Sequence, residues 1–244
     1  MTRHVAMGDM VRLAASGALC ALMASPALAG DRALIDFIGY SEDGRYFAFE
    51  EFGIQDGSGF PYSNIYIVDL PADTWVPGSP FRVRIDSEDA DLSDVRDEAH
   101  EQAEPKLDEL EIYEPAFPLF VNADGDPRAN AGDEAVFGDP GFGLDAVTGE
   151  RTLTLTTTPA TPGTDCAIID DEVFGFSLSL DGTEVYADPA TLPQSRGCAM
   201  GYKIYAVVRP SEWTGASAGE LAVISTYPFG FEGPDRRFLV VPLD

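Results

Sequence analysis

The sequence predicts a mainly β fold, with antiparallel sheets in a sandwich-like or partial-propeller arrangement and one amphipathic helix at about 91–112. Three observations predict this class. Short apolar runs of strand length recur along the chain, and Asp-Gly pairs at 43–44 and 181–182 each stand between two such runs, as in β-hairpins. Segments rich in Pro and Gly separate most of the other runs, whereas a helical spacing of apolar residues marks one segment.

The chain begins with a segment that has the composition of a secretory signal peptide. Arg3 and Arg12 give a basic start, residues 13–23 are mostly apolar, and Ala27-Leu28-Ala29 resembles a small-residue cleavage site. The apolar run is shorter than the roughly 20 residues that span a bilayer. We therefore predict a signal peptide over 1–29 and a single exported β-rich domain over 30–244, periplasmic or secreted, with no integral membrane segment.

Charge and histidine content disfavour several functions. The formal net charge is −27 and no cluster of Lys and Arg compensates it, so nucleic acid is not an expected partner. Beyond residue 29 the chain holds one histidine, His100. A Ser-His-Asp or Cys-His triad would have to use it, and a zinc site would lack a second imidazole.

The first strands are predicted at 33–40 and 45–52, with Gly44 at the positive-φ position of the turn between them. The second strand carries aromatic residues on both faces, which is typical of a central strand. Glu50 and Glu51 interrupt it, one on each face. We interpret the pair as the point where the strand emerges into solvent; a carboxylate with a raised pKa in an apolar setting is the functional alternative.

The segment 54–63, which precedes a strand at 65–70, is predicted to be an ordered, exposed loop. It holds two glycines, one proline and two aromatic residues. Long loops of such composition often carry binding. The ligand-binding candidates on and beside this loop are Gln55, Asp56, Phe60, Tyr62 and Asn64.

A half-exposed strand at 81–85 precedes the one helical segment. Its apolar stripe consists of residues spaced by three or four positions, namely Leu92, Val95, Ala99, Ala103, Leu107 and Leu110. Pro105 inside this pattern predicts a kink or a split. The other face is almost wholly acidic, which indicates a solvated surface, and His100 has no recognisable partner on it.

An acidic, Gly-containing region follows and resembles a calcium-binding loop in its spacing. Its oxygen ligands would be Asn122, Asp124, Asp126 and Asp133. Pro127 stands where the sharp turn of such a loop needs Gly, and Asp133 replaces the usual Glu. Calcium is therefore an alternative, and no other cofactor is expected.

The second half of the chain contains the remaining strands around a long loop at 188–201. They are predicted at 152–157, 173–180, 183–187, 202–208, 220–227 and 237–243. Cys166 and Cys198 are the two cysteines beyond residue 29. An even pair in an oxidising compartment favours a disulfide, with two unpaired thiols as the alternative.

Two parts of the chain share one order of hairpin, long loop and Ile-Tyr strand. The turn glycine and the isoleucine are 21 positions apart for Gly44 and Ile65, and 22 apart for Gly182 and Ile204. If the two parts are a repeat, their long loops flank one face of the domain. The order also resembles a blade of WD-repeat-like propellers, but two candidate blades are too few for a full propeller.

Four segments together, 37–53, 62–70, Ser195-Arg-Gly-Cys198 and 227–238, resemble a bacterial family of predicted secreted proteins of unknown function. The resemblance covers both ends of the mature chain and is weak from about residue 86 to 164. It implies export and supplies no catalytic residues.

These observations predict a non-enzymatic binding or interaction domain that contacts a protein or a small-molecule ligand through its Gly- and aromatic-rich loops. Two alternatives stay open. One is a carbohydrate-active hydrolase, which would need two carboxylates about 5–10 Å apart in a cleft. The other is a calcium-stabilised structural protein.

Overall fold

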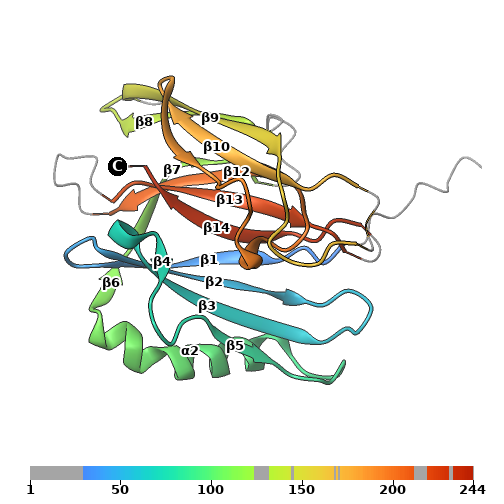
Figure 1. The fold of residues 1–244 in the computed structure, drawn as a ribbon. Coiled ribbons are helices and arrows are strands. Elements are labelled where there is room, and N and C mark those ends of the chain that lie inside the picture. The colour runs from blue at the N-terminus through green and yellow to red at the C-terminus, as the bar shows by residue number, and fades with distance from the viewer. Residues whose placement is uncertain are drawn as a thin grey trace, which may run out of the picture.

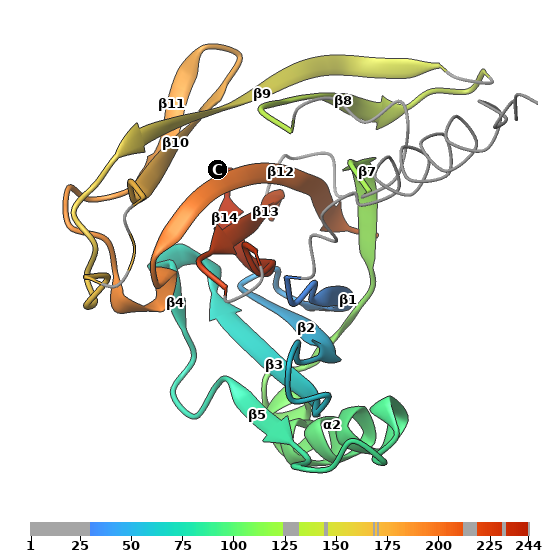
Figure 2. The same cartoon turned by 90° about the vertical axis from the view of Figure 1, so that its right-hand side faces the viewer.

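Three antiparallel sheets are stacked face to face, and a helix covers the outer face of the first (Figures 1 and 2). The computed structural model describes residues 30–123, 132–143, 146–167, 169, 171–211, 219–230 and 233–243. The fold is mainly β and sandwich-like, which confirms the predicted class. The predicted signal peptide, 1–29, lies outside the described residues.

The first sheet is formed by the N-terminal half of the chain. Its strands are β1 (Leu34–Ser41), β2 (Tyr46–Ile54), β3 (Pro61–Asp69), β4 (Thr74–Trp75), β5 (Phe81–Arg84) and β6 (Ile112–Glu114). They run in the order β4-β3-β2-β1-β6, with β5 also paired to β3. Gly44 has a φ of 70° in the turn between β1 and β2, as predicted. Because β2 and β3 pair from Tyr46–Asp69 to Ile54–Pro61, the loop between them is shorter than the predicted 54–63.

The second and third sheets contain the later strands. The second has the order β14-β13-β12-β7 and the third has the order β11-β10-β9-β8. The strands of the second sheet are β7 (Ala116–Val121), β12 (Ala199–Pro210), β13 (Leu221–Pro228) and β14 (Arg237–Pro242). Those of the third are β8 (Glu134–Pro140), β9 (Val147–Pro159), β10 (Phe174–Leu180) and β11 (Thr183–Ala187).

The second sheet lies between the other two and is buried on both faces. Its strand β13 shows this most clearly, because residues 221–226 are all buried. Ala222 and Ile224 pack in the core that the second sheet shares with the third. Leu221 and Val223 pack in the core that it shares with the first. Alternating side chains of one strand thus serve two separate cores.

The helix α2 (Leu92–Glu109) covers the first sheet from the opposite side (Figure 2). Its buried residues, Val95, Ala99 and Ala103, contact Ile65 and Val83 of the sheet. The helix is continuous through Pro105, so the predicted split does not occur. No helix among the residues that the structure describes is long and apolar enough to cross a membrane.

Glu50 and Glu51 do not emerge into solvent, which corrects the prediction: 0% and 1% of their surfaces are exposed. The prediction failed because β2 is central in a sheet that is covered on both faces. Glu50 faces α2, where Arg96 Nη2 lies 2.6 Å and His100 Nε2 3.1 Å from its carboxylate. Ser63 donates a further hydrogen bond to Glu50 at 2.7 Å. His100, for which the sequence indicated no partner, therefore belongs to an ionic cluster around the buried carboxylate of Glu50.

The two parts with a common element order do not share a topology. In the first part, β1, β2 and β3 are neighbours in one sheet. In the second, the hairpin β10–β11 belongs to the third sheet, whereas β12 belongs to the second. The similarity of the two parts is therefore confined to local sequence, and the structure does not support a repeat.

Candidate functional site

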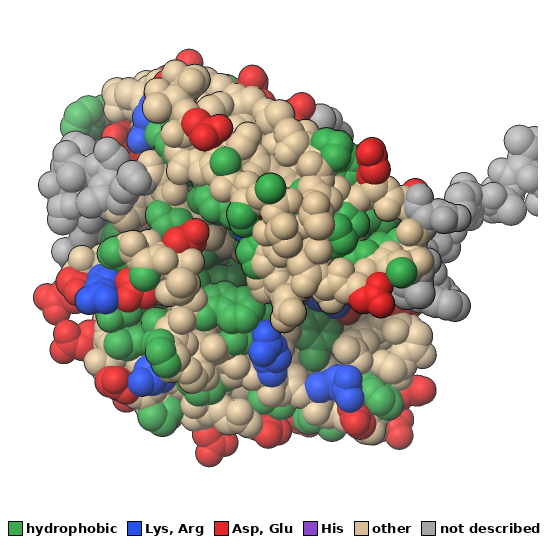
Figure 3. All heavy atoms as spheres, in the orientation of Figure 1, with side chains coloured by type: hydrophobic (Ala, Val, Ile, Leu, Met, Phe, Trp, Pro, Cys, Tyr) green, Lys and Arg blue, Asp and Glu red, His purple; other side chains and the backbone are tan. Residues whose placement is uncertain are grey.

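A groove of about 960 Å³ opens between the first and second sheets. Its floor is the face of β2 and β3 that is turned to the second sheet, and β14 borders it. Because β14 is the last strand of the second sheet, no further strand of that sheet covers the floor within the described residues. Figure 3 shows this hollow, with hydrophobic side chains inside it and Lys and Arg side chains around it. We call it the inter-sheet groove; the lining residues used below are Phe49, Glu51, Gln55, Tyr62, Asn64, Tyr66, Asp73, Trp75, Arg82, Arg84, Tyr186, Ser195, Arg196, Arg237 and Phe238.

The structure brings three of the five predicted ligand-binding residues to this groove, namely Gln55, Tyr62 and Asn64. Asp56 and Phe60 lie on the loop between β2 and β3 and do not line it. Tyr62 is 5% exposed, and its hydroxyl donates to Asp31 at 3.1 Å. It therefore acts as part of the wall, and the ligand-binding roles of all five residues remain predictions.

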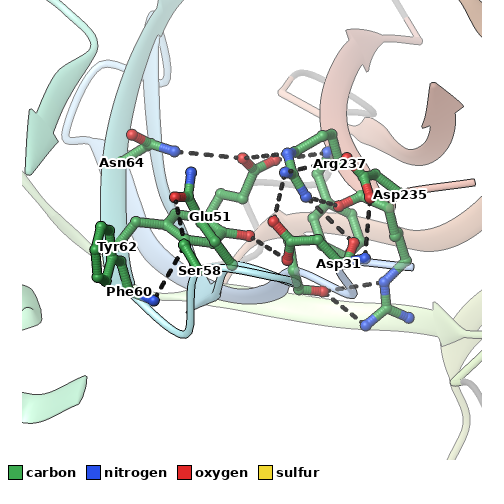
Figure 4. Close-up of polar contacts among 12 residues, drawn as sticks. Asp31, Glu51, Ser58, Phe60, Tyr62, Asn64, Asp235 and Arg237 are labelled. Carbon is green, nitrogen blue, oxygen red and sulfur yellow. Dashed lines mark hydrogen bonds and ion pairs between the residues drawn. The ribbon is translucent and has the colours of Figure 1, made fainter. Parts of the chain in front are cut away.

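A buried polar network joins the two sheets beneath the groove (Figure 4). Arg237 Nη2 on β14 lies 2.6 Å from Asp31 Oδ2, and Arg237 Nε lies 3.8 Å from Glu51 Oε1. The backbone N–H of Phe238 donates to Glu51 Oε2 at 2.8 Å, and Asn64 Nδ2 donates to Glu51 Oε1 at 3.5 Å. Glu51 thus satisfies a backbone donor of the edge strand.

Burial raises the pKa of Glu51 to about 7, although Arg237 and the Phe238 N–H act in the opposite direction. Burial dominates because a carboxylate loses its hydration between two packed sheets. The alternative considered from the sequence, a carboxylate whose pKa is raised by an apolar setting, therefore applies to Glu51. For Glu50, whose charge is compensated by His100 and Arg96, burial is outweighed and the pKa is lowered to about 2.

Aromatic rings form a row from the core to the mouth of the groove. Phe49 and Tyr66 stack with ring centroids 4.9 Å apart. Tyr66 and Trp75 follow at 5.5 Å in a tilted arrangement. Trp75 is 43% exposed, and the guanidinium carbon of Arg82 lies 5.7 Å from its ring centroid. The row gives the groove an apolar surface with a cation at its outer end.

The opposite wall is formed by the short helix η2 (Gln194–Arg196) and by β11. Arg196 Nη2 donates to the hydroxyl of Tyr186 at 2.7 Å and lies 3.0 Å from Asp188 Oδ1. Cys198 follows directly and forms the predicted disulfide with Cys166, with the two Cα atoms 5.8 Å apart. These contacts hold the wall to the third sheet.

Residues from both long loops of the sequence line the one groove. Gln55 comes from the loop after β2, and Ser195 and Arg196 come from the loop after β11. The two loops therefore flank one face even though their parts of the chain are not a structural repeat. The arginines of the groove were not predicted as site residues, because nothing in the sequence shows that 82–84, 196 and 237 converge.

The predicted calcium ligands are only partly within the described residues, because Asp124 and Asp126 lie outside them. The side-chain amide of Asn122 donates to the carbonyl of Ile204 at 3.3 Å, and Asp133 is exposed. Among the described residues, no three His, Cys, Asp or Glu side chains are grouped so that they could hold a metal ion. Calcium binding by residues 122–133 stays a prediction.

A family model described as Predicted secreted protein (DUF2259) matches residues 48–244. No curated protein matches the chain. The match covers every strand from β3 onward and most of β2, so it includes all residues that line the inter-sheet groove. Asp31, which binds Arg237 and Tyr62 beneath the groove, lies outside the match.

Proposed function

The chain belongs to this family of predicted secreted proteins, and we propose that it is an exported binding domain that holds a small ligand in the inter-sheet groove. The groove itself carries the proposal. A volume of about 960 Å³ is at the upper end of the range for small-molecule sites. Its aromatic row and its few polar side chains also match the usual composition of such sites.

The walls of the groove are rigid, which supports binding to a preformed site. The floor is a central part of the first sheet, and the edge strand β14 is fixed to it through Glu51 and Arg237. The opposite wall is fixed by the Arg196–Asp188 ion pair and by the disulfide. A ligand therefore meets ordered groups, so less conformational entropy is lost on binding.

The carboxylates of the groove favour binding over glycoside cleavage. Glycosidases need two carboxyl groups that reach the scissile bond. Of the two carboxylates that line the groove, Glu51 is 1% exposed and is occupied by the Phe238 N–H. A sugar could contact Asp73 but not the second carboxylate, so we propose a domain without hydrolase activity.

Titration with the neutral fluorophore N-phenyl-1-naphthylamine tests this proposal. Its emission rises in an apolar site, and we expect saturable binding with one site per chain. Ser195→Trp places a large side chain in the groove and should weaken this binding at least tenfold. Thr156→Trp, at an exposed position of β9, is the matched control and should bind as the unchanged protein does.

Two results of this titration would contradict the proposal. If the fluorophore does not bind, or binds the Ser195→Trp and Thr156→Trp variants equally, the groove is not a ligand site. Thermal melting of both variants shows whether the substitutions leave the fold intact.

A further inference from the structure

We propose that the ligand of the inter-sheet groove is a small organic anion with an apolar body, and that Arg82 binds its anionic group. This inference rests on the proposed function, since it names the chemical class of the ligand in the same groove. It comes from the distribution of charge over the groove and from the partners of each arginine.

Arginine is concentrated on the surface of the groove although the protein as a whole is strongly acidic. The formal net charge of the chain is −27, with 15 Lys and Arg against 42 Asp and Glu. Yet the charged residues that line the groove are four arginines and two carboxylates, namely Arg82, Arg84, Arg196, Arg237, Glu51 and Asp73. A cation in a low-dielectric cleft attracts an anion when no carboxylate of the protein offsets its charge, so the partners of each arginine decide which of them is available to a ligand.

Three of the four arginines are already paired with carboxylates of the protein. Arg84 lies 2.6 Å from Asp86, Arg196 3.0 Å from Asp188, and Arg237 2.6 Å from Asp31. Arg82 differs, because it forms no ion pair with any of the described residues. In a chain with so many acidic groups, an exposed arginine without a carboxylate at the mouth of a groove is well suited to a ligand's anionic group.

The contacts that Arg82 does make leave most of its N–H donors for a ligand. Its guanidinium carbon lies 5.7 Å from the centroid of the Trp75 ring, and its charge and a side-chain hydrogen bond to Tyr66 oppose the rise of the Tyr66 pKa that burial causes. Stacking on a ring uses the flat face of a guanidinium, whereas its five N–H donors lie in the plane. A carboxylate, sulfonate or phosphate oxygen could therefore accept two of them at once.

The aromatic row indicates that the rest of the ligand, beyond its anionic group, is apolar. An anion seated on Arg82 lies beside Trp75, from which the row leads inward to Tyr66 and Phe49. Aromatic or aliphatic groups would pack on this surface, and Asn64 and Gln55 would supply polar contacts. A wholly polar anion such as free phosphate would leave the aromatic row without a partner.

A pair of fluorophores with the same body separates the charge from the apolar contact. The anion 1-anilinonaphthalene-8-sulfonate and the neutral N-phenyl-1-naphthylamine share the anilinonaphthalene framework, and only the first carries a sulfonate. We expect the anion to bind about tenfold more tightly, as a charge-assisted hydrogen bond allows. Arg82→Gln should abolish this preference. It should lower the affinity for the anion about tenfold and change the affinity for the neutral probe less than twofold.

Two further variants control this experiment. Arg82→Lys keeps the charge without the planar donors and should retain part of the preference. Lys106→Gln removes one positive charge from α2, on the opposite side of the first sheet, and should leave both affinities unchanged.

The two proposals fail in distinguishable ways. Equal affinities for the two probes, or an unchanged preference in Arg82→Gln, would overturn the anion proposal and leave the binding groove standing. Absence of Ser195→Trp-sensitive binding for both probes would overturn the proposed function and this inference together.

Discussion

The carboxylate of Glu51, on the second strand of the chain, accepts the backbone N–H of Phe238, on the last strand, at 2.8 Å. The two residues are 187 positions apart and belong to different sheets. An edge strand normally presents unpaired backbone groups to solvent. Here a buried side chain of the neighbouring sheet occupies one of them, which fixes the border of the inter-sheet groove.

We expect replacement of Glu51 to change how stability depends on pH. Burial raises its pKa from 4.5 to about 7, so the folded protein binds this proton more tightly than the unfolded chain does. The contribution to stability is complete below pH 4.5 and is lost as the pH rises through about 7. In the unchanged protein, the free energy of unfolding should therefore fall by roughly 3 kcal/mol over that range because of Glu51. Glu51→Gln should not show this decrease, as measured by urea unfolding at pH 4.5, 6 and 8. Parallel pH profiles for the two proteins would contradict this assignment.

Glu50 should behave in the opposite sense. Its pKa is lowered from 4.5 to about 2, because His100, Arg96 and Ser63 together outweigh the effect of burial. Its stabilising contribution is therefore present above pH 4.5 and is lost as the pH falls towards 2. Glu50→Gln leaves Arg96 without its buried partner and should cost roughly 3 kcal/mol at pH 7 and much less at pH 2.

A control variant for the Glu50 prediction is available on α2, the helix that carries Arg96 and His100. Glu98 of α2 is exposed and accepts a hydrogen bond from the side-chain amide of Gln102 at 3.2 Å. Glu98→Gln should change the free energy of unfolding by less than about 0.5 kcal/mol. A loss for Glu98→Gln as large as that for Glu50→Gln would show that helix charge, and not the buried cluster, is responsible.

The disulfide should matter for both stability and binding. Cys166 and Cys198 are 32 positions apart, and closing a loop of that size stabilises by about 3–4 kcal/mol in the chain-entropy model. Replacing both by Ser should lower the melting temperature and also weaken fluorophore binding, because Ser195 and Arg196 stand just before Cys198. Unchanged affinity in a folded double variant would show that Arg196 and its partners hold the wall without the disulfide.

Export should remove residues 1–29. The intact mass of the exported protein is then expected to correspond to a chain that begins at Gly30, and Ala29→Arg should block the cleavage. The fold supports this boundary, because the backbone N–H of Asp31 already donates to Asp235 at 2.9 Å and Arg236 N–H donates to the Asp31 carbonyl at 2.7 Å. An exported protein of full-length mass would contradict the prediction.

The sequence predicted those elements whose signals are local. The two Asp-Gly hairpins, the single helix and the closing strands follow from turn chemistry and from apolar periodicity, which neighbouring residues determine. Strands β4, β6, β7 and β8 were not predicted. Ile112–Glu114 and Ala116–Val121 follow the helix almost directly, and proline and acidic residues obscure their alternation.

The site was less predictable, because it depends on contacts between distant segments. Tyr62, Asn64 and Gln55 were identified from the composition of one loop. Arg82 and Arg196 reach the same groove only through the stacking of sheets. Glu50 and Glu51 were misread for a related reason: their burial depends on a helix and a sheet that lie far away in sequence.

The position of the second sheet has a consequence for the order of folding. It supplies one side of both large cores, and three of its four strands, β12 to β14, follow every strand of the other two sheets in sequence. Neither core can be completed while residues 199–242 are missing, so a partly synthesised chain has no stable β sandwich to form. Delayed folding of this kind suits a polypeptide that must cross a membrane as an extended chain and reach its native state only on the far side.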